Sequence, residues 1–134
     1  MNKNARREFI VVFGQSLHWS GKFLNKNISH VFVVSLQSGF WLRLDPTPKG
    51  LETQVTAYNA ETLNMIRKMD DVRALRVTVH RSKSYFAKVG VMTCTDVAQY
   101  ILGLHFRWCW TPYQLYKRLL KLKDSGDVDI TIIR

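Results

Sequence analysis

Hydrophobic residues recur along this chain with two different spacings, one typical of strands and the other typical of helices. Short apolar runs and two-residue alternation, both rich in β-branched residues, indicate strands. The expected strands are residues 9–13, 30–36, 40–45, 51–58, 72–79 and 127–134. Apolar residues spaced by three and four positions indicate helices. The expected helices are residues 60–69, 94–106 and 112–123.

Capping signals locate the starts of the last two helices. Thr93 is followed three residues later by Asp96, and Thr111 by Gln114, each just before an apolar run. In such a capping box the threonine is the N-cap residue, and a proline after it, as in the second motif, suits the first helical position. Cys94 is therefore expected to be the first residue of its helix.

The order of these elements is typical of an α+β protein. We expect a single domain, residues 1–134, with an antiparallel sheet and helices packed on one side of it. Pro46 and Pro48 are expected to end the strand at 40–45, because proline cannot donate a hydrogen bond to a neighbouring strand.

The hairpin of residues 30–45 is compatible with more than one register. With a two-residue loop, either Ser38-Gly39 or Gln37-Ser38, His30 and Asp45 lie on the same face, directly opposed or on a diagonal. A three-residue loop with Gly39 in the left-handed conformation would put them on opposite faces. Gly39 suits loops of both lengths, so the sequence leaves the register open.

Composition adds a strong positive charge to this picture. The 134 residues carry a net charge of +10, and 46% of them are hydrophobic, as in an ordinary folded domain. Such a charge favours binding to nucleic acid or other anionic surfaces, although no zinc-finger, RNP-type or basic-zipper motif occurs. No apolar run approaches the roughly 18 residues of a membrane span. The basic start of the chain leads into too short an apolar run for a secretory signal.

The two cysteines, Cys94 and Cys109, form neither a disulfide framework nor a zinc site. We expect both to be reduced, in an intracellular protein or one assembled inside a cell, and we expect no metal or cofactor. Cys109 is interpreted as a core residue. The tryptophans on either side of it, Trp108 and Trp110, are compatible with a core cluster or with an interface.

Cys94 is the candidate nucleophile. A thiol at a helix N-terminus lies beside unpaired backbone N–H groups and the positive end of the helix dipole, and both favour the reactive thiolate. The alternative is that Cys94 is a small core residue, which is the commoner role of a reduced cysteine.

A nucleophilic cysteine needs a base within hydrogen-bond reach and usually a group that orients the base. His30 fits best because it begins a strand and has Asp45 as a candidate neighbour. His105 would lie roughly 16 Å from Cys94 along their shared helix, at about 1.5 Å per residue, which is too far. The remaining histidines lie in or beside loops: His18 and His80.

Three motifs occur in an informative order. A strand-borne histidine in SHVFVVS is followed by a strand ending in aspartate in WLRLDP, and then by a cysteine that opens a helix in TCTDVAQYILG. This order resembles the circularly permuted papain-like superfamily, in its lecithin:retinol acyltransferase-like branch. The closing segment, RWCWTPYQLYKRLL, is similar to small proteins of tailed bacteriophages. The resemblance spans about residues 17–120.

The resemblance implies a permuted papain-like fold, with Cys94 as nucleophile, His30 as base and Asp45 as the orienting residue. The chain departs from the superfamily's frequent N-C-E-x-F pattern, because Thr93 and Thr95 flank the cysteine. It implies a phage-encoded cysteine hydrolase or acyltransferase acting on an amide-type bond, such as a peptide or peptidoglycan cross-link, in the host cytoplasm or the virion.

Two other functions fit the sequence. One is a catalytically inactive structural protein of the virion, in the tail or the head–tail junction, that associates with other virion proteins. The other, which the charge alone suggests, is a basic nucleic-acid-associated protein.

Overall fold

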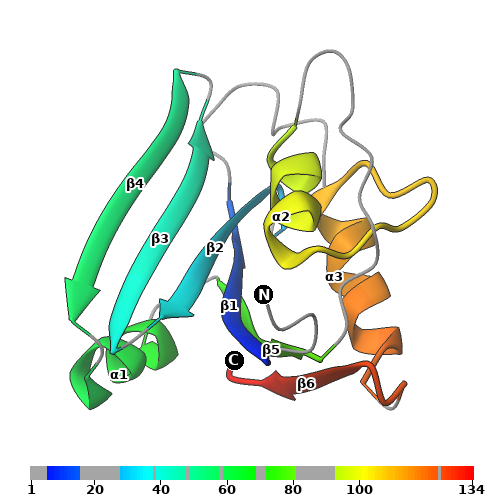
Figure 1. Ribbon diagram of the computed structural model, residues 1–134. Coiled ribbons are helices and arrows are strands. Elements are labelled where there is room, and N and C mark those ends of the chain that lie inside the picture. Colours follow the sequence, from blue (N-terminus) through cyan, green and yellow to red (C-terminus); the bar gives the residue numbers. More distant parts are fainter. Residues whose placement is uncertain are drawn as a thin grey trace.

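The computed structural model describes residues 6–15, 28–37, 39–47, 49–57, 59–68, 72–80, 93–123 and 125–134. The strands are β1 (Arg7–Gly14), β2 (His30–Gln37), β3 (Phe40–Thr47), β4 (Gly50–Ala57), β5 (Arg73–Val79) and β6 (Val128–Ile132). The helices are α1 (Ala60–Lys68), α2 (Cys94–Leu102) and α3 (Pro112–Lys121) (Figure 1). The expected α+β composition is confirmed, with element ends shifted by a few residues.

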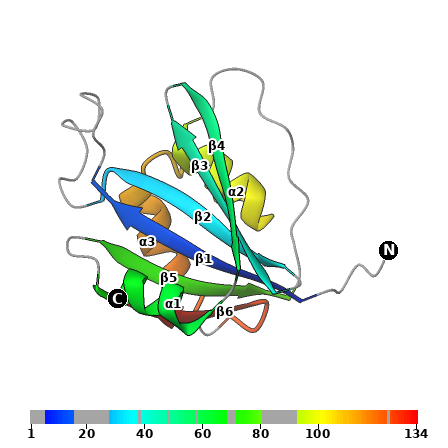
Figure 2. The same cartoon turned by 90° about the vertical axis from the view of Figure 1, so that its left-hand side faces the viewer.

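All six strands form one antiparallel sheet in the order β4-β3-β2-β1-β5-β6 (Figure 2). The first four strands form a meander, and β5 returns to pair with the free edge of β1. The central position of β1 follows from its sequence, because a strand flanked on both edges and covered on both faces must be apolar throughout.

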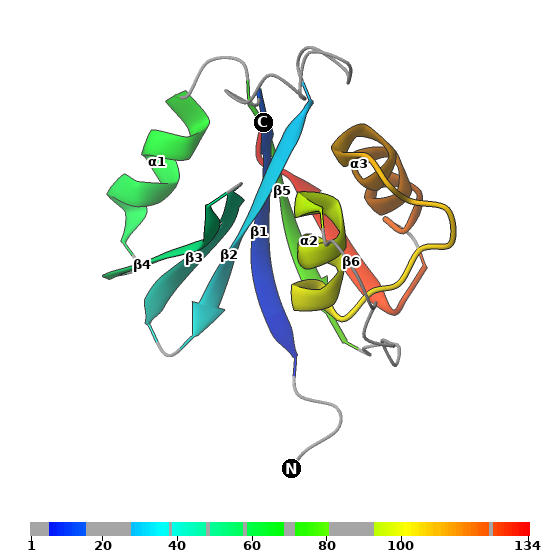
Figure 3. The same ribbon diagram turned by 90° about the horizontal axis from the view of Figure 1, so that it is seen from above.

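The helices cover both faces of the sheet, so the prediction that they pack on one side is wrong (Figure 3). Phe9, Val11 and Phe13 belong to the buried cluster that contains the core residues of α2 and α3. Ile10 and Val12 point the other way, into a second cluster that α1 covers. The continuous apolar run of β1 would expose alternate side chains to water if only one face were covered, and α1 prevents this.

Helix α2 is shorter than the predicted 94–106. Gly103 adopts the left-handed conformation, with φ of 68°, and its N–H donates to the carbonyl oxygens of Gln99 and Tyr100. Glycine takes this conformation at little cost, so the chain turns back there even though apolar residues continue to residue 106.

Strand β3 continues past Pro46, so the prediction that the prolines end it is wrong in part. Pro46 pairs with Leu51 of β4, and Thr47 pairs with Gly50. The pairing of β3 with β2 has already stopped at this point, so β3 has only one neighbouring strand there. Proline is tolerated in a strand with one unpaired edge.

The β2–β3 hairpin has a two-residue loop. Gln37 pairs with Phe40, and the register runs on to Val33 opposite Leu44. This register makes His30 and Asp45 diagonal neighbours on the same face, which is one of the arrangements that the sequence left open. Gly39 has φ of 83°, as a tight hairpin turn requires.

Beyond Val33 and Leu44, strands β2 and β3 separate, whereas β3 stays paired with β4 as far as Thr47 (Figure 1). We call this opening the β2–β3 fork. Helix α2 packs against both of its strands. None of the helices in the described part of the chain is both long and apolar enough to cross a membrane.

Candidate active site

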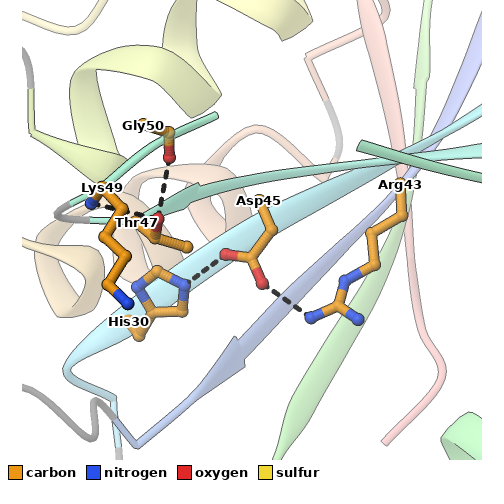
Figure 4. Close-up of polar contacts among 6 residues, drawn as sticks. All are labelled: His30, Arg43, Asp45, Thr47, Lys49 and Gly50. Atoms are coloured by element: carbon orange, nitrogen blue, oxygen red, sulfur yellow. Dashed lines mark hydrogen bonds and ion pairs between the residues drawn. The ribbon is translucent and has the colours of Figure 1, made fainter. Parts of the chain in front are cut away.

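His30, Asp45 and Arg43 form a hydrogen-bonded row on the hairpin (Figure 4). His30 Nε2 lies 2.6 Å from Asp45 Oδ1, and Arg43 Nη2 lies 2.6 Å from Asp45 Oδ2. Asp45 is only 7% exposed, so both of its oxygens are engaged in a site largely removed from solvent. Charge-assisted bonds of this length hold a ring in one orientation. Asp45 is therefore placed to orient His30.

Cys94 is the first residue of α2, as the capping signal predicted. Thr93 is the N-cap residue, and its Oγ1 accepts a hydrogen bond from the Asp96 backbone N–H at 3.2 Å. The Asp96 carboxylate in turn accepts one from the Thr93 backbone N–H at 3.0 Å. The cap holds the first turn in place, so the thiol stays at the positive end of the helix dipole.

The structure brings Cys94 and His30 into contact, and each changes the other's acidity. The hydrogen bond with Cys94 is the main reason that the pKa of His30 is raised above its ordinary 6.5; Asp45 adds to this effect and burial opposes it. Burial by itself would raise the pKa of Cys94, but hydrogen bonds from His30 and the Val31 backbone N–H outweigh it, and the pKa falls below 9.0. Both shifts favour a thiolate–imidazolium pair.

The thiol occupies the β2–β3 fork. Backbone N–H groups of a strand point sideways toward a neighbouring strand. Val31 lies where β3 has already separated from β2, and its N–H donates to the sulfur of Cys94. The thiol thus takes the place of a strand partner, at the point where His30 begins β2.

Thr95 is a further residue of this site, and the sequence did not indicate its role. Its side chain is completely buried, and its hydroxyl has no hydrogen-bond partner of ordinary geometry in the described part of the chain. It lies close enough to Cys94 to make a small contribution to the lowered pKa of the thiol. A buried hydroxyl without a well-formed hydrogen bond costs free energy. Such groups are rare in folded proteins, and a role in a functional site is one reason for them.

Arg43 is the second residue that the sequence did not indicate. Besides its bond to Asp45, its guanidinium lies 4.6 Å from the centroid of the Phe32 ring. Arg43 and Asp45 are two residues apart on one strand and so share a face. That spacing was readable in the sequence, but its meaning depended on where His30 would lie.

The other candidate residues lie outside this site. Cys109 is buried, as predicted for a core residue, and burial raises its pKa to about 11. His80 bonds to Asp129 at 2.7 Å, and His105 is exposed beyond the end of α2. His18 lies outside the described residues. In the part of the chain that is described, no cluster of three or more His, Cys, Asp or Glu residues is arranged to hold a metal ion.

The two capping boxes allow a matched test of the helix contribution. Thr93→Ala and Thr111→Ala should each lower the free energy of unfolding by about 1 kcal/mol, since both remove an N-cap side chain. Only Thr93→Ala should slow alkylation of Cys94, by about two- to fivefold, because fraying of α2 weakens its dipole at the thiol. Urea unfolding and iodoacetamide kinetics measure the two effects. Equal slowing in both variants would mean that the helix start does not activate Cys94.

No family model, curated protein or solved structure matches this chain. The α+β fold with its six-stranded antiparallel sheet is established by the structure itself. The circularly permuted papain-like relationship stays a prediction from the motifs.

Proposed function

We propose that this protein is a cysteine hydrolase or acyltransferase that acts on an amide, ester or thioester carbonyl. One observation carries the proposal: a cysteine at a helix N-terminus contacts a histidine that a buried aspartate orients. Covalent acyl transfer needs a nucleophile, a base that contacts it and a group that orients the base. Cys94, His30 and Asp45 are in contact in that order.

In the proposed mechanism each group has one step. His30 Nε2–H donates to Asp45, which leaves Nδ1 for the thiol proton of Cys94. The thiolate attacks the carbonyl carbon, and the carbonyl oxygen becomes an oxyanion. The backbone N–H groups of Cys94 and Thr95, at the start of α2, are suited to stabilise it.

The imidazolium then returns the proton to the leaving amine, alcohol or thiol as the carbon–leaving-group bond breaks. A thioester of Cys94 remains. Water, deprotonated by His30, hydrolyses it in a hydrolase, whereas a second nucleophile accepts the acyl group in an acyltransferase. The proton cycle closes on His30 in both cases.

The papain-like ancestry and the phage affiliation belong to the same proposal. Their support is the chain order of His30, Asp45 and Cys94 together with the closing segment, and the α+β architecture is compatible with them. Under this proposal the substrate is a peptide or peptidoglycan cross-link, and the protein works in the host cytoplasm or within the virion.

Trapping of the acyl-enzyme tests the proposal. Incubation with an activated ester such as p-nitrophenyl acetate should add one acetyl group, which peptide mapping by mass spectrometry places on Cys94. Cys94→Ala should abolish this labelling, and Cys109→Ser should leave it unchanged. A folded protein that is not acylated at Cys94 would contradict the enzymatic proposal and favour the inactive structural protein instead.

A further inference from the structure

The connection between α2 and α3 displays two tryptophans to solvent. Trp108 is 62% exposed and Trp110 is 60% exposed, and their ring centroids lie 5.5 Å apart at an interplanar angle of 69°. Exposure of two neighbouring indoles forgoes the large gain from burying them. The sequence left open whether these rings belong to the core or to an interface, and the structure excludes the core.

The backbone that carries the two rings is held firmly. Gln99 of α2 is 2% exposed; its Oε1 accepts from the Phe106 N–H at 3.0 Å and its Nε2 donates to the Cys109 carbonyl at 3.2 Å. One buried amide thus ties together both sides of the turn. Gln114 of α3 accepts from the Trp110 N–H at 2.8 Å. These hydrogen bonds hold the backbone of the turn in one conformation, which restricts the directions in which the two rings can point.

Trp108 is also held in a strained conformation. Its φ is 60°, and it is the one described residue other than glycine with a positive φ. A bulky residue in the left-handed region is strained and persists only when its surroundings enforce it. Here the hydrogen bonds of Gln99, and one from Arg118 to the Arg107 carbonyl at 3.3 Å, hold Trp108 in this conformation. Asparagine or glycine would fit this position with less strain, so the turn itself does not require the indole.

Around this turn, most of the buried hydrophobic side chains are aliphatic and the exposed ones are aromatic, while Phe106 and Tyr116 pack against the core. Leu104, Leu115 and Leu119 are buried, whereas the exposed large hydrophobic side chains among the described residues of α2, α3 and their connection are all aromatic. A surface that inserts into lipid would use exposed aliphatic residues as well. Trp, Tyr and Arg also occur at protein interfaces, so the exposed rings alone do not identify the partner, and the charge around them decides it. Flat aromatic faces without aliphatic neighbours are suited to stacking.

The connection between α2 and α3, together with α3 itself, carries only positive charge. The sequence from Val97 to Lys123 contains no Asp or Glu, and its basic residues are Arg107, Lys117, Arg118, Lys121 and Lys123. Two of them lie over aromatic rings: Arg107 is 5.8 Å from the Trp108 ring centroid, and Lys117 is 4.9 Å from that of Tyr113. Cations and stacking surfaces are therefore interleaved.

We propose that this surface binds single-stranded nucleic acid. We call it the Trp platform and define it as Arg107, Trp108, Trp110, Tyr113 and Lys117. Unpaired bases expose π-faces that stack on aromatic side chains, and the phosphates between them contact the basic residues. Duplex DNA hides its base faces and is expected to bind more weakly. The Trp platform and the Cys94 site share no residue, so this inference is independent of the proposed hydrolase activity.

The test uses the full chain with Cys94→Ala, so that acyl transfer plays no part. Fluorescence anisotropy with a labelled oligothymidine should show binding that weakens about sevenfold between ~50 and ~200 mM salt, for the two basic residues of the Trp platform at a slope of roughly −0.7 each. Trp110→Ala should weaken binding by about 5- to 150-fold, the range for loss of one stacked base. Phe40→Ala, at a 55% exposed ring on β3, is the matched control and should bind normally.

Trp108→Asn separates a role in binding from a role in folding. Asparagine tolerates the left-handed conformation, so the melting temperature should be unchanged or higher while affinity for oligothymidine falls. Unchanged affinity in both tryptophan variants would overturn the proposal. So would binding that does not depend on salt, or binding to phosphatidylglycerol vesicles without binding to the oligonucleotide.

Discussion

His30→Asn should slow acylation of the protein by an activated ester about 100- to 10,000-fold, the range for loss of a positioned general base. Asparagine cannot accept the thiol proton of Cys94. The variant also removes the contact that most strongly lowers the pKa of the thiol, so that burial, which raises the pKa, is no longer opposed by the ring.

The pH dependence of Cys94 alkylation shows how much of the effect of His30→Asn comes from the changed pKa of the thiol. In the unmodified protein, alkylation of Cys94 should increase with pH through a midpoint below 9.0, because the thiolate is the reactive form. In His30→Asn the midpoint should move upward. The rate at neutral pH should then fall, and the rate at high pH should recover much of the difference.

His80→Asn is the matched control. His80 also bonds to an aspartate, Asp129, at a similar distance, but it lies at the end of β5, away from the thiol. This variant should keep full activity and the same alkylation midpoint. Loss of activity in both variants would point to a general structural effect of histidine–aspartate pairs. An active His30→Asn protein would exclude His30 as the base.

Cys94 should react with iodoacetamide at pH 7 at least tenfold faster than Cys109, and the two thiols thus serve as an internal comparison. A pKa of about 11 for Cys109 against one below 9.0 for Cys94 gives Cys94 at least a ~100-fold larger thiolate fraction. A less basic thiolate is intrinsically less nucleophilic, and this reduces the expected ratio of the two rates about eightfold.

Burial adds to the difference, since Cys109 is only 2% exposed and Cys94 is half-buried. Mass spectrometry after timed quenching measures both rates in one sample. Full unfolding in urea should make the two rates nearly equal, because it removes the burial and the hydrogen bonds. Equal rates in the folded protein would contradict the activation of Cys94.

The sequence by itself determined the local structure on which the site is built. The strands, the helices and the two capping boxes follow from periodicity and from hydrogen bonds between residues three apart, all of which are short-range effects. For that reason the place of Cys94 at a helix start, and of His30 on a strand, was predictable. The same local rules placed the end of α2 too late, because apolar spacing continues past the glycine that turns the chain.

Only the tertiary structure decided which of these groups meet. The hairpin register that makes His30 a diagonal neighbour of Asp45 depends on a loop that the sequence left open, and the role of Arg43 depends on that register. Helix α1 lies on the opposite face because both faces of β1 must be buried. The pattern along one strand does not say which helix covers which face. The contact between Cys94 and His30 arises because β2 and β3 separate and α2 begins in the fork. Contacts across 64 positions of chain depend on how the layers pack, and packing is a property of the whole fold.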